Sequence, residues 1–176
     1  LDAVEEMFPA ALRYLGLDPD SKKEADLEKA GELLRKIRPH IQKFHSSEYI
    51  NALANGDICL AVGYSGDVLQ AKKRAVEAKN KVEISYVIPK EGALMWFDSF
   101  VIPKDAGNQD AALQFIDFVN RPEMAAKNSD FIQYANGNLA AKPLLSAEVR
   151  DNPGIYPTDA VMSRLYTITP YDQKTQ

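Results

Sequence analysis

Three short apolar runs alternate with segments of helical spacing, and this alternation strongly limits how the chain can fold. The runs cover residues 58–63, 82–87 and 94–102, and each has the length of a single strand. Strands that alternate with helices are typical of α/β layers with largely parallel pairing. Because ligands in such sheets bind at the carboxyl ends of strands, the residues after each run are the first candidates for a site.

The helices are predicted from apolar residues that recur every three or four positions and from the residues that end them. The first fifteen residues show this spacing, and Gly16 stands where a helix C-cap would. A second helix over residues 27–37 should stop before Pro39. Further helices are predicted over 46–55 with Ser46 or Ser47 as the cap and over 66–78. Another should begin at Asn108 or Gln109 and run to residue 119, and more are predicted from Pro122 onward and near 146–150 and 158–165.

Composition excludes several classes of function. The formal net charge is −4 and the 21 Lys and Arg are dispersed, so the chain has no electrostatic footprint for nucleic acid. The apolar runs are far shorter than the roughly 20 residues of a membrane-spanning helix. His40 and His45 lack metal-ligand spacing, and Cys59, inside an apolar run, is predicted to be an inert core residue. We therefore expect no metal, no cofactor, no nucleic acid and no direct membrane insertion.

The sequence lacks the common motifs of phosphate binding and of covalent hydrolysis. The stretch GYSGD, residues 63–67, does not have the phosphate-loop pattern and places an acid where a phosphate would need amides and Lys. No G-x-S-x-G motif occurs, and neither histidine is tied to a serine or cysteine nucleophile. An enzyme that uses Asp98 and Asp67 as acid and base is the lesser alternative.

The stretch ALMWFDSFVIP contains the only tryptophan, Trp96, two residues before a carboxylate, Asp98. Side chains alternate along a strand, so both should point the same way, about 7 Å apart. A ring face beside a carboxylate suits an organic ammonium group, which the ring attracts and the carboxylate hydrogen-bonds. From spacing alone, a core tryptophan followed by an Asp that caps a turn is the more common arrangement.

A second aromatic and acidic pair stands where the run 58–63 ends and a helix begins. Tyr64 follows the run, and Asp67 lies in the first turn of the helix, where the helix dipole favours an acid without any ligand. The same junction is where an α/β protein places its ligand. Two such pairs are better evidence for a cation site than either pair alone. Glu5 and Glu6 are not evidence by themselves, because acids are also expected in the first turns of a helix.

Three segments resemble one protein family in order and in detail. The stretches FHSSEYINALANGDICLAVGYSGDV, ALMWFDSF and QYANGN closely resemble the periplasmic spermidine/putrescine-binding proteins of bacterial ABC importers. The resemblance covers essentially the whole chain but only the second half of such a protein. It implies an α/β, two-lobed periplasmic binding-protein fold of type II, present as a fragment that lacks the N-terminal portion.

The resemblance also implies where the chain divides. Residues 1–98 should belong mainly to one lobe, and residues 99–176 should return mainly into the other lobe and add the C-terminal helices. The chain begins at Leu1 without a starting Met and shows no signal peptide, so we expect a fragment or a processed segment. In that case some apolar surface should be exposed or covered by another copy.

The site residues implied by the resemblance form an aromatic box with carboxylates. Aromatic rings would lie along the methylene chain of a polyamine, carboxylates would hold its nitrogens, and a hydroxyl would add a minor contact. The residues at the matching positions are Trp96, Tyr64 and Tyr134, then Asp98, Asp67 and Glu6, and finally Ser46.

The implied function is capture of a polyamine in the periplasm and its delivery to an ABC transporter permease, without enzymatic activity. The large indole of Trp96 favours spermidine over putrescine. A receptor domain that senses a polyamine through the same site is an alternative that the sequence does not separate from transport.

Overall fold

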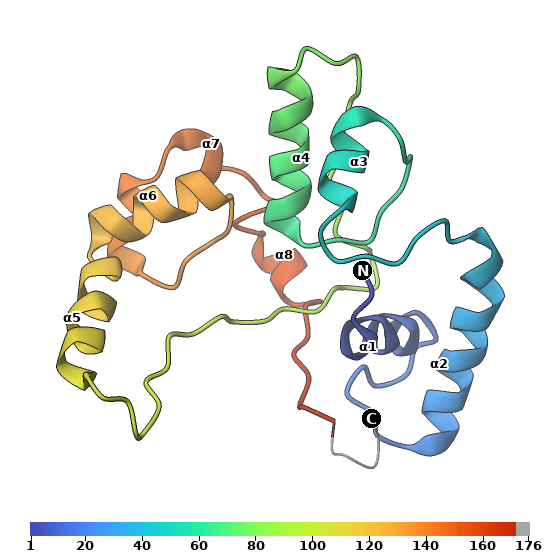
Figure 1. Cartoon of the computed structure of the whole chain (residues 1–176). Coiled ribbons are helices and arrows are strands. Elements are labelled where there is room, and N and C mark those ends of the chain that lie inside the picture. The colour runs from blue at the N-terminus through green and yellow to red at the C-terminus, as the bar shows by residue number, and fades with distance from the viewer. Residues whose placement is uncertain (172–176) are drawn as a thin grey trace.

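A computed structural model describes residues 1–171 (Figure 1). Its regular structure is helical. The elements are α1 Val4–Tyr14, α2 Glu24–Ile37, the 3₁₀ turn η1 Arg38–His40, α3 Tyr49–Asn55, α4 Ser65–Glu77, α5 Gln109–Val119, α6 Pro122–Ile132, the 3₁₀ turn η2 Leu139–Leu144, α7 Ala147–Arg150 and α8 Asp159–Met162. Within the described part of the chain, no helix is long and apolar enough to cross a bilayer.

The helices pack around three apolar clusters. In one, α1 and α2 lie side by side and bury Leu12 and Ala30 completely. In the second, α3 packs against α4, with Ala71 and Ile84 at the contact. The third joins α6, η2 and α7, and Leu69 of α4 packs against its edge, which connects the second cluster to the third. The candidate site lies where α1, α3 and α4 approach one another (Figure 1).

The predicted α/β character is not confirmed, because residues 1–171 contain no strand. The runs 58–63, 82–87 and 94–102 lie outside the helices, and the described residues hold one isolated parallel bridge, between Leu94 and Tyr166. A strand requires a partner whose backbone groups complete the ladder. The run 82–87 still shows a period of two in burial, since Ile84 is buried while Val87 is 73% exposed, as expected for a strand with one covered face.

Most predicted helix ends are confirmed. The side chain of Asn108 accepts a hydrogen bond from the backbone N–H of Ala111 at 3.1 Å, and Pro122 occupies the first turn of α6. Gly16 has a φ of +72°, the left-handed conformation that ends a helix after α1. Ser146 caps α7, and Asp67 lies in the first turn of α4 as predicted.

Two local predictions are wrong. Neither Ser46 nor Ser47 caps α3, because the helix begins at Tyr49 and its N-cap is Glu48, which makes no capping bond. The hydroxyl of Ser46 instead contacts the carboxylate of Asp2. Cys59 is exposed rather than buried in a core, since the run in which it lies has no strand beside it.

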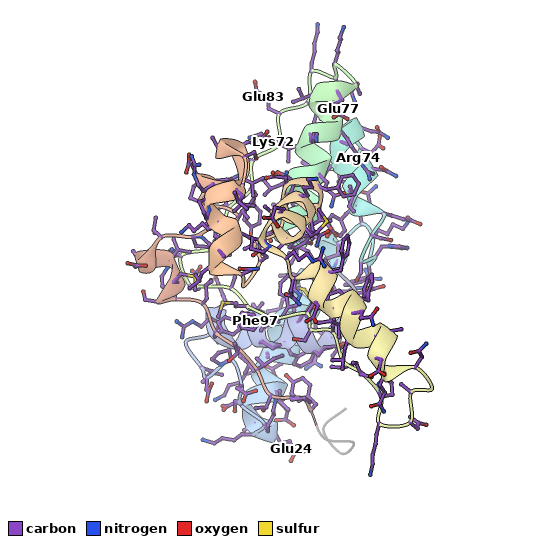
Figure 2. All side chains as sticks on the ribbon, turned by 90° about the vertical axis from the view of Figure 1, so that its left-hand side faces the viewer. Glu24, Lys72, Arg74, Glu77, Glu83 and Phe97 are labelled. Atoms are coloured by element: carbon purple, nitrogen blue, oxygen red, sulfur yellow. The ribbon has the colours of Figure 1, made fainter. Side chains whose placement is uncertain are left out.

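Large apolar side chains remain exposed along the unpaired runs and on α5. Leu60 is 89% exposed and Phe97 is 75% exposed, and α5 buries none of its residues although it carries Phe115 and Phe118. The all-side-chain view places Phe97 away from the charged end of α4, where Lys72 and other polar residues gather (Figure 2). Exposed apolar area of this kind marks a surface that normally contacts something else.

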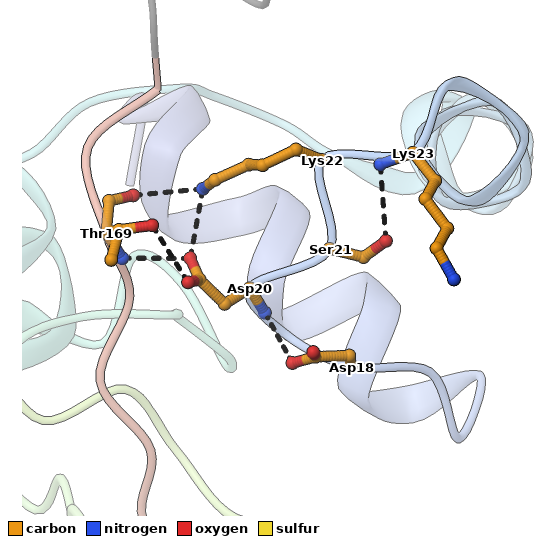
Figure 3. A network of polar contacts seen from close by, with 6 residues as sticks. All are labelled: Asp18, Asp20, Ser21, Lys22, Lys23 and Thr169. Carbon is orange, nitrogen blue, oxygen red and sulfur yellow. Dashed lines mark hydrogen bonds and ion pairs between the residues drawn. The ribbon is translucent and has the colours of Figure 1, made fainter.

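The segment around Thr169 is tied to the loop between α1 and α2 (Figure 3). Asp20 accepts hydrogen bonds from the backbone N–H and the hydroxyl of Thr169, both at 2.8 Å. Lys22 donates to Asp20 at 3.0 Å and to the carbonyl of Thr169 at 2.9 Å. This network joins residues about 150 positions apart and keeps the last described segment beside α1.

Candidate ligand-binding site

The loop at residues 63–67 positions two predicted site residues at the start of α4. Tyr64 is the N-cap residue, with extended backbone angles of −75° and 144°, and its carbonyl accepts the first hydrogen bond of the helix from Val68. Asp67 follows within the first turn, where the partial positive charge of the helix end favours a carboxylate. The start of α4 therefore fixes the backbone positions from which both side chains extend.

The carboxylate of Asp67 lies between two tyrosine hydroxyls. Tyr49, from α3, donates to Oδ2 at 2.8 Å, and Tyr134, just after α6, donates to Oδ1 at 3.1 Å. Burial raises the pKa of Tyr49 and of Tyr134, and the neighbouring Asp67 raises them further. Both phenols therefore keep their protons and act as donors over the physiological pH range.

A second chain of contacts runs from Glu6 through Tyr64 to Trp96. The hydroxyl of Tyr64 donates to Oε1 of Glu6 at 3.0 Å, and burial followed by Glu6 raises the pKa of Tyr64 to about 12. The rings of Tyr64 and Trp96 meet edge to face, with centroids 5.2 Å apart and planes at 65°. Partial burial raises the pKa of Glu6 above the ordinary value of 4.5, although the bond from Tyr64 opposes this shift.

Asp98 and Ser46 stand apart from these contacts. Asp98 is exposed and makes no hydrogen bond or ion pair within residues 1–171. That Trp96 and Asp98 share one face therefore stays a prediction. Ser46 makes its contacts with Asp2 and does not line the concave surface that the other candidates share.

The other six candidates line one open concavity of about 2920 Å³. A pocket for one small ligand usually measures about 300–1,000 Å³, so this is an open face and not an enclosed site. The exposed apolar runs line the same concavity. The candidates that share it are Glu6, Tyr64, Asp67, Trp96, Asp98 and Tyr134.

The arrangement suits an organic cation. Among the described residues, none of the carboxylates of Glu6, Asp67 and Asp98 forms an ion pair with Lys, Arg or His. Uncompensated carboxylates beside aromatic rings attract ammonium groups through charge-assisted hydrogen bonds and through the ring quadrupole. No group of three or more His, Cys, Asp or Glu in residues 1–171 could hold a metal ion.

Sequence reasoning missed Tyr49, which contacts both Asp67 and the backbone N–H of Tyr64, the latter at 3.0 Å. A tyrosine on the apolar side of a short helix has the same pattern as a core residue, and Tyr49 is indeed buried. The nearby Gly63 is a usable signal in retrospect, because it leaves space for the ring of Tyr49.

The chain belongs to a family of bacterial solute-binding proteins. The family model described as "Bacterial extracellular solute-binding protein" matches residues 2–158. The predicted family resemblance is thereby confirmed, and the family description agrees with the predicted location outside the cytoplasmic membrane.

Individual relatives support this assignment. The chain is 54% identical over 176 residues to the putrescine-binding periplasmic protein SpuD of Pseudomonas aeruginosa, covering 100% of this chain and 48% of the relative. It is 55% identical over 175 residues to the putrescine-binding periplasmic protein PotF of Escherichia coli, covering 99% of this chain and 47% of the relative. The chain thus spans about half the length of these curated relatives. These relatives are named as binding proteins, which agrees with the prediction of a solute-binding protein.

A solved structure gives the same picture. A putative spermidine/putrescine ABC transporter from Listeria monocytogenes superposes with a TM-score of 0.84 at 30% identity, over 99% of this chain and 52% of that one. The fold described above therefore also occurs as about half of a longer chain.

Proposed function

We propose that this chain is the carboxyl-terminal half of a two-lobed periplasmic protein that captures a polyamine and delivers it to an ABC transporter permease. The observation that supports this most directly is the shared concavity, which is lined by the rings of Tyr64 and Trp96 and by three carboxylates that form no ion pair among the described residues. The names of the relatives point to the same ligand class.

Each side chain has a distinct proposed role. The rings of Trp96 and Tyr64 lie along the methylene chain, and the carboxylates of Asp98, Asp67 and Glu6 hold its ammonium nitrogens. Tyr134 lines the site and also orients Asp67. Ser46, the proposed minor polar contact, has the least support of the seven candidates, because its hydroxyl contacts Asp2 outside the concavity.

The proposed division into lobes falls between Asp98 and Ser99. It is supported by the long segment between α4 and α5, which lies outside the helices and crosses over to α5 (Figure 1). In an empty closed cleft the carboxylates would be buried without partners, which costs several kcal/mol per ion. A bound polyamine supplies the missing charges, so it favours the closed state, and the permease can recognise that state.

Two observations make opposite predictions about the length of the ligand. The relatives SpuD and PotF are named for putrescine, whereas the indole of Trp96 offers a large face that favours the longer spermidine. Calorimetric titration of the full-length protein with putrescine, cadaverine, spermidine, spermine and amino acids separates them. We expect a saturable heat from a polyamine and none from amino acids.

The isolated 176-residue chain serves as a comparison in this experiment. We expect it to bind polyamines weakly or not at all, because its concavity is open on one side. Binding of the isolated chain in the micromolar range or tighter would refute the proposal that a second half completes the cleft. Absence of polyamine binding by the full-length protein would refute the proposed function itself.

A further inference from the structure

Tyr49 contacts both site residues of the loop at 63–67 but does not itself reach the concavity. Its hydroxyl donates to Oδ2 of Asp67 at 2.8 Å and accepts a hydrogen bond from the backbone N–H of Tyr64 at 3.0 Å. The side chain is 6% exposed and is absent from the surface that lines the concavity, whereas Tyr134 is part of that surface. A ligand in the concavity can therefore meet Asp67 and Tyr134 but not Tyr49.

The ring of Tyr49 has little freedom to move. It packs in the cluster of α3 and α4 with Leu53, Val68 and Ala71. On its other side it lies against Gly63, where an added Cβ would come within 2.5 Å of the ring carbon Cε2. A ring that is enclosed in this way presents its hydroxyl at one fixed point.

We infer that Tyr49 is a positioning residue that fixes the orientation of the Asp67 carboxylate before the ligand arrives. The inference rests on the proposed function, in which Asp67 holds an ammonium nitrogen. A carboxylate has two oxygens and about four lone-pair directions. Because the buried Tyr49 holds Oδ2, the remaining lone pairs of the Asp67 carboxylate point in fixed directions. A ligand therefore does not have to restrict the rotation of the Asp67 side chain when it binds.

The two tyrosines on Asp67 differ in what they can do. Tyr134 lies beside the concavity, so its hydroxyl oxygen can accept a hydrogen bond from a ligand ammonium group while the hydroxyl donates to Asp67. Tyr49 cannot meet a ligand, because its side chain is buried and does not line the concavity, and its hydroxyl oxygen already accepts from the backbone N–H of Tyr64. Tyr49 therefore holds Asp67 and the loop at residues 63–67 in a fixed position relative to α3, both when the site is empty and when it is occupied.

The first test uses the ligand-free, full-length protein with ¹³C-labelled aspartate. The Asp67 carboxyl resonance is identified by its loss in Asp67→Asn. We expect Tyr49→Phe, which keeps the ring and removes the hydroxyl, to shift this resonance. Tyr14→Phe is the control, because Tyr14 is 65% exposed at the end of α1 and does not line the concavity, while the hydroxyls bound to Asp67 are those of Tyr49 and Tyr134. An Asp67 resonance that does not move in Tyr49→Phe would overturn the inference.

The second test is a double-mutant cycle on putrescine and spermidine affinity. Tyr49→Phe should weaken binding roughly tenfold, because it removes a hydrogen bond to a charged group. In the Asp67→Asn background the same change should matter less than twofold. An equal loss in both backgrounds would show a general structural effect and refute the positioning role. If the unmodified protein binds neither polyamine, the proposed function fails, and the resonance test still decides the role of Tyr49.

Discussion

The contact between Gly66 and Tyr134 provides a sharp test of the site. Gly66 lies in the first turn of α4, and a Cβ added there would stand 2.2 Å from Cε2 and 2.3 Å from Cδ2 of the Tyr134 ring. Carbon atoms in contact need about 3.5 Å, so the ring must move by roughly 1.3 Å in Gly66→Ala. The hydroxyl of Tyr134 is already 3.1 Å from Asp67, and a displacement of this size breaks the hydrogen bond.

Stability and affinity should respond differently to Gly66→Ala. Overpacking costs about 1–3 kcal/mol, while alanine gains about 1 kcal/mol over glycine within a helix. We therefore expect the free energy of unfolding to fall by only about 1 kcal/mol. The loss of a donor to the Asp67 carboxylate, together with a displaced ring in the concavity, should weaken polyamine binding roughly tenfold or more.

The assays are urea unfolding and calorimetric titration of the full-length protein. Gly107→Ala is the control, because nothing lies within 4 Å of an added Cβ at that position. It should change neither quantity measurably. If Gly66→Ala binds polyamine as tightly as the unmodified protein, Tyr134 does not contribute to the site through Asp67, and the reasoning from this contact is wrong.

Three further changes test separate parts of the molecule. Asp98→Asn should weaken polyamine binding at least tenfold in titrations. It should change the free energy of unfolding by no more than about 0.5 kcal/mol, because Asp98 is exposed and has no partner among the described residues. Equal affinity would remove Asp98 from the site. Burial raises the pKa of Glu6 in the folded state, so the contribution of Glu6 to stability is present below pH 4.5 and declines as the pH rises through the raised value. Glu6→Gln should therefore flatten the pH dependence of ligand-free thermal unfolding between pH 4 and 7. An unchanged profile would contradict this. Asp20→Ala removes both hydrogen bonds to Thr169 and should lower the free energy of unfolding by about 1 kcal/mol without affecting polyamine affinity. A change in affinity would instead link this distant network to the site.

The helices could be predicted because their signals are local. Asn108 and Pro122 mark helix starts through bonds and angles within one turn, and the structure confirms both. The strands could not be confirmed, because a strand depends on a partner elsewhere. The run 82–87 keeps a strand-like alternation of burial, yet no other segment of residues 1–171 completes a ladder with it.

The candidate site was predictable in part for the same reason. Tyr64 and Asp67 could be placed at the start of a helix from the local sequence, and the structure puts them there. The bond from Tyr64 to Glu6 joins residues 58 positions apart, and no local pattern encodes such a contact. Tyr49 was missed because a buried tyrosine that packs and a buried tyrosine that orients a carboxylate have the same sequence pattern.

The uncompensated carboxylates and the exposed apolar runs lie on the same concave face, and this coincidence has a physical consequence. Covering that face buries apolar side chains such as Phe97, which is favourable, but it also takes Asp98 and its neighbours out of water, which is costly unless a cation accompanies them. If the proposed function holds, the two contributions oppose each other when the site is empty and act together when a polyamine is bound. On that proposal the face makes closure depend on the ligand, which is the property that a solute-binding protein needs in order to signal occupancy to a transporter.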